Sequence, residues 1–392
     1  MDYVFSDKMN ALAPSAIREI LKATSQPGII PFAAGNPAPE AFPTDAVREI
    51  SARLLRDRPV DCLQYGVTEG YAPLRERVKA DIETRLGIGT AADDLIITSG
   101  AMQVMDLATK VLCNEGDTII CESPSFIGSL NTFRSYGVRL RGVPMQADGM
   151  DVDALEHALQ TEPNVRFIYT IPNFQNPTGI TMSLAKRRRV LELARQHNVL
   201  VLEDNPYGEL CYDGDVLPCI KSFDEEGRVI YAGSFSKILS PGMRVGYALA
   251  AQPIIAKMTV GKQASDVHTT MWAQLVVDEW LQHDDVAAHV RKICEIYTAK
   301  RDTMCNGLAG TALCYQVPAG GLFLWCDLLP NIDMLDLTKR AIAAGVAVVP
   351  GSAFAVQADD KINAVRLNFS TPTDEQLVQG VAILRGVACS FS

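Results

Sequence analysis

Short apolar runs of strand length alternate with longer amphipathic segments from about residue 94 to residue 250. The longer segments, at 101–112, 126–136 and 183–196, repeat their apolar residues with the period of a helix, whereas the short runs are rich in Val and Ile. This alternation predicts an α/β fold with a mostly parallel sheet covered by helices. The runs expected to form strands are 95–98, 118–121, 165–170, 199–203, 229–232 and 245–250.

The rest of the chain predicts a smaller α+β domain. The pattern of apolar residues predicts helices from 250 to about 309. A β-like run follows at 314–327, and Pro-Ala-Gly-Gly interrupts it. A helix at 333–344 and strands at 346–349 and 364–370 follow. Because 392 residues exceed what one core usually serves, we expect more than one domain. The expected parts are 1–50, which contributes to a discontinuous small domain, 51–285, the large domain, and 286–392, the small C-terminal domain.

Three helices are predicted ahead of the first strand, at 9–24, 44–56 and 72–85. Ser15 is a candidate N-cap for the apolar face of the first helix. Between the first two helices, residues 32–43 are too rich in Pro for a central strand, and we expect them to form an ordered loop.

Composition narrows the class of protein. The chain has 36 Lys and Arg against 46 Asp and Glu, and the net charge of −10 argues against nucleic acid as a partner. It holds no run of 18 uncharged apolar residues for a membrane span, and its N-terminus does not resemble a secretory signal. The ten cysteines form no Cys-x-x-Cys pair and the five histidines show no ligand spacing. We therefore expect reduced thiols, no metal site and a cytoplasmic location.

Polar residues gather where the predicted strands end, which is where ligands bind in folds of this kind. Gly100 lies in a turn before a helix, whose free N–H groups suit a phosphate. Asn176 closes a cluster of three amides, and Asp204 ends an apolar strand, where a half-buried acid needs a cationic partner. Each also has an ordinary structural explanation: a helix cap, an Asx turn or a buried salt bridge.

A fourth strand end carries Lys237 between hydroxyls. Ser234 and Ser236 precede this lysine, and Arg244 follows it seven positions later. An amine that condenses with an aldehyde, beside hydroxyls and a guanidinium that bind phosphate, would form a receptacle for a phosphorylated aldehyde. Taken alone, the stretch is also compatible with a strand followed by a solvated turn. A protonated pyridine nitrogen would be a suitable partner for Asp204, and a ring oxygen would be one for Asn176.

Four motifs in this order resemble a known family. They are Asn-Pro-Thr-Gly at 176–179, Asp-Asn-Pro-Tyr at 204–207, Gly-Ser-Phe-Ser-Lys at 233–237 and Pro-Gly-Met-Arg-Val-Gly at 241–246. The chain resembles the class I, fold-type I, aminotransferases that use pyridoxal 5'-phosphate, and among them the 2-aminoadipate and kynurenine aminotransferase subgroup. The resemblance covers nearly the whole chain. It implies a large cofactor-binding domain with a mostly parallel sheet and a smaller discontinuous domain.

The resemblance implies the following cofactor contacts. Lys237 binds the aldehyde carbon and later acts as acid and base, Asp204 pairs with the ring nitrogen, and Asn176 and Tyr207 bind the ring oxygen. Phe126 stacks on the ring where the family usually has Tyr, and Met102 departs from the usual Gln. Residues implied at the phosphate are Gly100, Ala101, Met102, Ser234, Ser236, Arg244 and, from a neighbouring subunit, Tyr65, so that a homodimer is implied.

The resemblance also implies how substrates bind. Arg366, in Arg-Leu-Asn-Phe-Ser at 366–370, matches the arginine that binds the substrate α-carboxylate. Asn176 and Gly35 are implied beside it. Arg18 matches a position that meets the distal carboxylate of aminoadipate-type substrates, although an arginine on an amphipathic helix is also typical of a solvated face.

The implied reaction is transamination between an L-amino acid with a 2-aminoadipate-like, aromatic or similarly long side chain and a 2-oxo acid, with 2-oxoglutarate as the expected acceptor. Two alternatives stay open. A lyase or decarboxylase would share the lysine and the aspartate. A non-catalytic regulator that senses the cofactor is disfavoured, because the segment ahead of Phe32 is too short for a winged helix and the chain is acidic.

Overall fold

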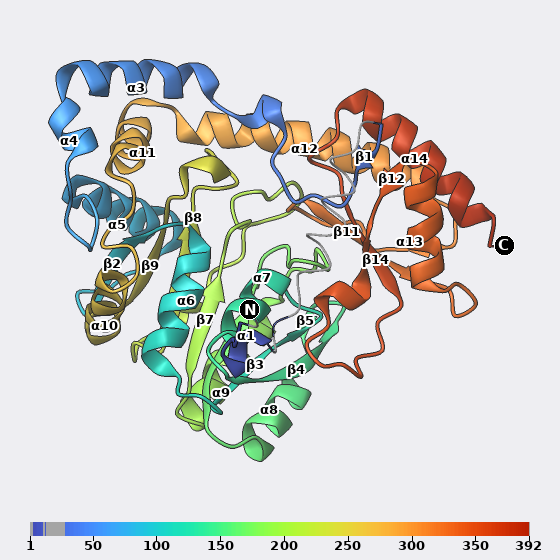
Figure 1. The fold of residues 1–392 in the computed structure, drawn as a ribbon, viewed down its shortest axis with the longest axis horizontal. Helices are drawn as coiled ribbons and strands as arrows, with labels where there is room; N and C mark the ends of the chain where they lie inside the picture. The colour runs from blue at the N-terminus through green and yellow to red at the C-terminus, as the bar shows by residue number, and fades with distance from the viewer. Residues whose placement is uncertain (1–2, 11, 13–27, 392) are drawn as a thin grey trace.

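An eight-stranded sheet forms the centre of the larger of two units, on the left and in the centre of Figure 1. The computed structural model describes residues 3–10, 12 and 28–391. The strand order is β2-β9-β8-β7-β6-β3-β4-β5. Strands β8, β7, β6, β3 and β4 are parallel, and β9 runs antiparallel between β2 and β8. The strand bounds are β2 Asp93–Thr98, β3 Thr118–Ser123, β4 Arg139–Gln146, β5 Gly149–Met150, β6 Val165–Thr170, β7 Leu200–Asp204, β8 Val229–Ser234 and β9 Gly246–Ala251.

Helices cover both faces of this sheet because its strands are apolar on both sides. Phe167 of β6 packs into the core shared with α6 and α7, whereas its neighbour Ile168 packs into a separate core shared with α8 and α9. The helices of this unit are α3 Thr44–Asp57, α4 Pro59–Leu63, α5 Ala72–Leu86, α6 Ala101–Leu112, α7 Ile127–Arg134, α8 Val152–Thr161, α9 Leu184–Gln196, α10 Gln252–Gln263 and α11 Met271–His283.

The smaller unit, on the right of Figure 1, is built on the antiparallel sheet β10-β11-β14-β13. The long helix α12 extends towards it from the larger unit. Strand β1 (Ile30–Pro31) pairs with β12 (Val346–Ala347), so an early segment joins this unit. The domain limits at 50 and 285 stay a prediction. The other bounds are α12 Val286–Leu308, β10 Leu313–Cys314, β11 Phe323–Leu328, α13 Met334–Ala343, β13 Val349–Pro350, β14 Ala364–Asn368 and α14 Asp374–Cys389.

The predicted fold class is confirmed, with local corrections. The expected strand at 346–349 is two strands, β12 and β13, that pair in different sheets. Helices α4, α8 and α14 and strand β4 are additional elements. Of the expected helix at 9–24, only its first residues fall within the described chain, where α1 spans Asp7–Asn10. Ser15 and Arg18 lie outside the described residues.

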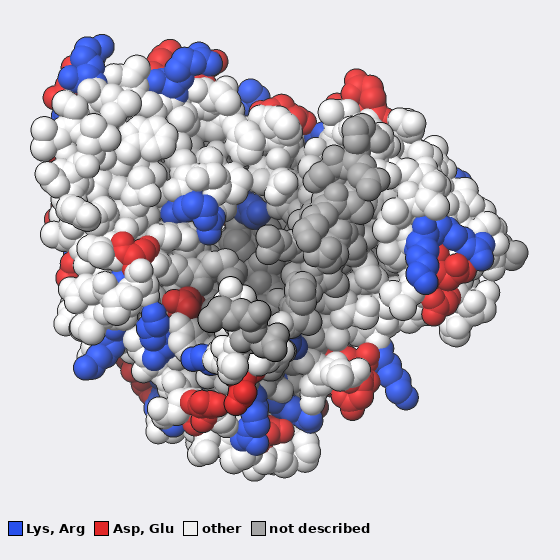
Figure 2. Space-filling model, viewed as in Figure 1, with Lys and Arg blue, Asp and Glu red and all other residues white. Residues whose placement is uncertain are grey.

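Several general features bear on the class of protein. Within the described ranges, no helix has the length and apolar character needed to cross a membrane. All ten cysteines are described, and all are free thiols. Among the described side chains, no cluster of His, Cys, Asp and Glu is arranged to hold a metal ion. Figure 2 shows basic and acidic side chains intermixed around the rim of one face, with broad uncharged areas between them.

Candidate active site

Residues far apart in the sequence meet at the carboxyl ends of β6, β7 and β8. Lys237 Nζ donates a 2.9 Å hydrogen bond to the carbonyl oxygen of Gly35 and lies 5.9 Å from the centre of the Tyr207 ring. Asn176 Nδ2 lies 3.5 Å from the Tyr207 hydroxyl, and Arg366 Nη1 donates to Asn176 Oδ1 at 2.9 Å. The fold therefore brings together the predicted lysine, ring-oxygen partners and carboxylate-binding arginine.

Asp204 ends β7 as a buried carboxylate with one free oxygen. Its Oδ2 accepts a 2.9 Å hydrogen bond from the Tyr169 hydroxyl, which lies 2.8 Å from the Ser129 hydroxyl. Its Oδ1 is buried and has no partner among the described residues. Burial raises the pKa of Asp204 to about 7. A cation placed at the free oxygen would offset this burial and keep the carboxylate ionised.

The amine of Lys237 is easier to deprotonate than an ordinary lysine. Burial is the main cause, followed by the positive charges of Arg366 and Arg244, and together they lower the pKa of Lys237 to about 8. A neutral amine is the form that attacks an aldehyde. Near pH 8, a large fraction of this lysine is therefore ready to react.

Arg366 of β14 is a buried cation held without a carboxylate among the described residues. Its guanidinium carbon lies 4.2 Å from the centre of the Phe323 ring and 4.8 Å from that of Phe354. Nη2 donates to the Ala33 carbonyl oxygen at 2.8 Å, and Nε is buried without a partner in the described chain. Burial lowers the pKa of Arg366 to about 10. The aromatic rings orient the guanidinium while leaving its charge for a ligand.

A polar corner forms where α6 begins. Gly100 has a φ of +79°, and a Cβ at this position would lie 2.3 Å from Nη2 of Arg244. That Nη2 donates to the Ser99 carbonyl oxygen at 3.2 Å. The N–H groups of Ala101 and Met102 belong to the first turn of α6, where the helix itself offers no acceptors. Here the close approach of backbone and guanidinium creates a site suited to a phosphate.

The hydroxyls of Ser234 and Ser236 are 2.9 Å apart, in the segment that carries Lys237.

Phe126, the residue before α7, and Met102 both border Gly128. A Cβ added at Gly128 would lie 2.6 Å from the Phe126 ring and 3.3 Å from the Met102 sulfur. Tyr65 is 81% exposed, and its ring packs edge-on against His268 at 5.7 Å. It therefore points to solvent in the isolated chain.

Two buried polar residues beside the site had escaped prediction. Tyr169 sits inside the apolar run of β6, and nothing in that pattern distinguishes it from a packing residue. Glu122 accepts a 3.0 Å hydrogen bond from Gln175 Nε2 and others from Thr170 and the Ile171 N–H, so it anchors the loop that carries Asn176. Glu122 follows an apolar run, the same signal that identified Asp204.

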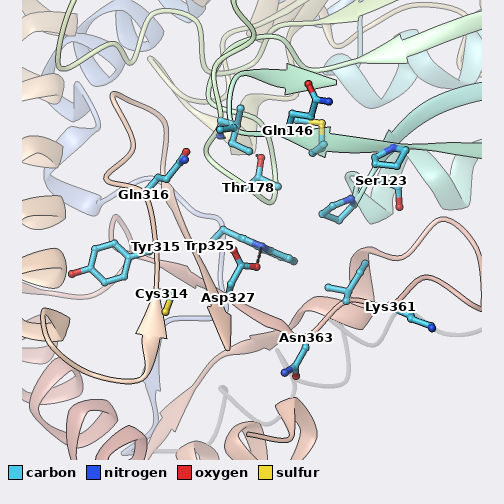
Figure 3. Close-up of a pocket in the computed structure, with 16 residues that line it drawn as sticks. Ser123, Gln146, Thr178, Cys314, Tyr315, Gln316, Trp325, Asp327, Lys361 and Asn363 are labelled. Atoms are coloured by element: carbon cyan, nitrogen blue, oxygen red, sulfur yellow. Dashed lines mark hydrogen bonds between the residues drawn. The ribbon is translucent and has the colours of Figure 1, made fainter. Parts of the chain in front are cut away.

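A cavity of about 570 Å³ lies between the two units but does not include these groups (Figure 3). Trp325 lies in the middle of the view, and its Nε1 donates to Asp327 at 3.1 Å. The ring of Trp325 packs edge-on against Phe354, which in turn contacts Arg366. Lys237 and Asp204 do not line this cavity.

A mostly parallel sheet whose carboxyl edge brings together a lysine and, among the described residues, a carboxylate and a guanidinium without counter-ions is the arrangement expected of an enzyme that uses pyridoxal phosphate. The family model for aminotransferase class I and II matches residues 27–384. The chain therefore belongs to the class I and II aminotransferases, and its reaction is transamination with pyridoxal phosphate as cofactor.

Relatives of similar length support this assignment. The chain is 39% identical to aromatic-amino-acid aminotransferase 1 of Thermococcus litoralis, over 97% of this chain and 93% of the relative. It is 38% identical to 2-aminoadipate transaminase of Thermus thermophilus, over 96% and 94%. The crystal structure of Pyrococcus horikoshii kynurenine aminotransferase in complex with PMP superposes with a TM-score of 0.94 at 37% identity, over 98% and 97% of the two chains.

The residues present fit this cofactor. The orphaned Oδ1 of Asp204 matches a protonated ring nitrogen, and the corner at Gly100 and Arg244, which no Cβ could enter, matches a phosphate. Lys237 supplies an amine of lowered pKa for the aldehyde. Asp204, Lys237 and the Gly100 corner lie around one site. A single molecule that carries a ring nitrogen, an aldehyde and a phosphate could therefore contact all three.

Proposed function

We propose that this protein transfers the amino group of an L-amino acid with a long side chain, aromatic or 2-aminoadipate-like, to a 2-oxo acid, with 2-oxoglutarate as acceptor. The observation that carries the proposal is the cradle itself, in which Lys237 lies with the uncompensated buried charges of Asp204 and Arg366. The activities named for the relatives from Thermococcus litoralis and Thermus thermophilus support the choice of side chains.

In the proposed mechanism, Asp204, Asn176 and Tyr207 make the polar contacts with the cofactor ring. When bound, pyridoxal phosphate supplies an aldehyde and an electron-accepting ring. Asp204 keeps the ring nitrogen protonated, which requires the carboxylate to stay ionised despite its raised pKa. Asn176 and Tyr207 donate hydrogen bonds to the ring oxygen. Lys237 would hold the cofactor at its aldehyde carbon and would serve as the acid and base at the substrate Cα.

The proposed phosphate contacts are the N–H groups of the first turn of α6 and the side chains of the lysine segment. Phe126 would stack on the ring face. The residues that bind the phosphate in this proposal are Gly100, Ala101, Met102, Ser234, Ser236 and Arg244.

On the substrate side, Arg366 binds the α-carboxylate, assisted by Asn176. The carbonyl oxygen of Gly35, which accepts from the Lys237 amine, is proposed to lie beside the substrate as well. Arg18 is proposed to meet a distal carboxylate. The exposed Tyr65 is proposed to reach the phosphate of a second subunit in a homodimer. A cytoplasmic location is proposed from the free thiols.

The test is a panel of amino donors with the wild type and Lys237→Ala. Lys237→Ala should lose transamination with every donor, whereas Lys257→Ala, on the exposed face of α10, should keep it. Aminoadipate, kynurenine and aromatic donors should react faster than small aliphatic ones. Transamination by Lys237→Ala at the parental rate would refute the mechanism, and a preference for small aliphatic donors would refute the substrate class.

The alternative lyase reaction has its own signature. A lyase would release pyruvate and ammonia from a cysteine conjugate without any 2-oxo acid. We expect turnover of the proposed donors to require the acceptor.

A further inference from the structure

A second cavity, of about 400 Å³, adjoins the segment that carries Lys237. It lies among α5, the residues after β7, the β8 and β9 strands, and the adjoining ends of α11 and α12. Of the residues proposed to hold the cofactor, only Ser234 also lines this cavity. Its volume falls in the range of small-molecule sites. Its apolar lining includes Val78, Leu86, Phe235, Ile238, Val286 and Val290.

One corner of this cavity is polar. Tyr247 of β9 is 5% exposed and lines the cavity, and its hydroxyl makes no hydrogen bond with any described residue. Beside it, Arg85 pairs with Asp81 and with Glu209, each at 2.9 Å. The hydroxyl is open to the cavity, so a ligand atom or water can pair with it there.

The charges around the cavity select against an ion. The charged lining residues are Asp81, Glu209, Arg85 and Arg291, two of each sign. Asp81 and Glu209 already pair with Arg85, and Arg291 is exposed to solvent, so a charged ligand would leave water for at most a solvated counter-ion. The Tyr247 hydroxyl has no partner among the described residues, and it can both donate and accept a hydrogen bond.

We propose that this cavity binds a small, neutral, largely apolar molecule with one hydrogen-bonding group, the class that includes phenols and indoles, and that its occupation alters the environment of Lys237. The apolar body would contact Val286 and Val290, one helical turn apart on α12, and Phe235, which also lines the cavity. The polar atom would pair with Tyr247.

The coupling rests on the way the lysine segment is attached. Phe235 and Ile238, on either side of Lys237, both line the cavity. His289, next to Val290 on α12, lies 2.8 Å through Nε2 from the carbonyl oxygen of Ile238. The wall of the cavity and the lysine segment are therefore in direct contact, and a ligand that restrains one restrains the other.

Binding is tested on the cofactor-loaded enzyme by calorimetric titration with indole. We expect saturable binding that is abolished when Val290→Phe or Val286→Phe fills the cavity, and unchanged in Val378→Phe, an exposed valine on α14. Tyr247→Phe should weaken binding by about tenfold, the effect of one lost hydrogen bond. Undiminished binding in both filled variants, with cofactor content retained, would overturn the site. Tighter cavity-dependent binding of benzoate than of phenol would overturn the neutral class.

Coupling is tested by the pH titration of the absorbance of the bound cofactor, with and without saturating indole. The midpoint should shift in the wild type and stay fixed in Val290→Phe. Binding without a shift would retain the site and overturn the coupling. Because calorimetry needs no turnover, its outcome is independent of the proposed donor and acceptor.

Discussion

Buried charged side chains are paired at one edge of the large sheet and lack counter-ions at the other. At the amino edge of the parallel strands, Lys221 Nζ lies 2.8 Å from Asp93 and 2.9 Å from Asp224, and the three side chains are 1%, 3% and 0% exposed. At the carboxyl edge, Asp204 and Arg366, which extends from β14 to Asn176, are 4% and 3% exposed, yet neither has a counter-ion among the described residues.

The difference separates charges that pair within the chain from those proposed to act on the cofactor and the substrate. A buried charged group with atoms that lack any hydrogen-bond partner is unfavourable, and Asp204 Oδ1 and Arg366 Nε are such atoms among the described residues, which favours a ligand at both. The charges around Lys221 are satisfied inside the chain and should contribute to folding alone. Those of Asp204 and Arg366 should affect catalysis strongly and stability weakly.

The largest effect on stability is expected at the paired edge. Lys221→Met would leave Asp93 and Asp224 buried without a cation and should lower the free energy of unfolding by about 3–5 kcal/mol. Urea unfolding measures this loss. Lys79→Met is the matched control, because Lys79 pairs with Asp94 at 2.8 Å but is 40% exposed, and it should lose no more than about 1 kcal/mol. Equal losses in the two variants would contradict the comparison.

At the unpaired edge, Asp204→Asn should reduce kcat roughly 100- to 1,000-fold, because the ring nitrogen loses the charge that keeps it protonated. Its stability without cofactor should not fall, since a buried acid has been removed. Tyr169→Phe keeps that acid and loses one hydrogen bond, so a decrease of about tenfold is expected. Steady-state kinetics at saturating substrate measure both, and a larger effect in Tyr169→Phe than in Asp204→Asn would be inconsistent with this account.

A smaller effect is expected at Arg366. Arg366→Lys keeps the positive charge but loses the planar fork and its packing between two rings, and should raise KM for the amino donor about tenfold or more. Arg340→Lys is the control, because Arg340 also lies over an aromatic ring, that of Phe391 at 4.4 Å, but on the surface. Initial-rate measurements over donor concentration separate the two, and an unchanged KM in Arg366→Lys would exclude the carboxylate role.

The smallest effect concerns pH. Because the pKa of Lys237 is lowered to about 8 from 10.5, the neutral amine predominates above pH 8. The rate at which the apoprotein takes up pyridoxal phosphate should therefore rise with pH and level off above a midpoint near 8. In Arg366→Met one repulsive charge is gone, so this midpoint should move upward, but only in part because burial remains the main cause. A wild-type midpoint near 10.5 would contradict the buried setting of Lys237.

The sequence identifies candidate site residues best where a polar residue follows an apolar run of strand length. Asp204 and Lys237 could be identified because they follow the runs 199–203 and 229–232, which became β7 and β8. Their proximity followed from the shared edge of parallel strands. The role proposed for Tyr65 rests only on the resemblance, because nothing in the residues around this exposed tyrosine predicts a contact with a ligand.

The sequence by itself determined the alternation of strands and helices, and with it the edge at which Asp204 and Lys237 lie, because side-chain periodicity and strand ends are local properties. Tertiary structure alone decided that β9 enters antiparallel beside β8, that Tyr169 holds Asp204, and that Phe323 and Phe354 enclose Arg366. These are contacts between segments up to hundreds of residues apart. Strand order and side-chain packing create these contacts, and the pattern of residues within one segment predicts neither the strand order nor the packing.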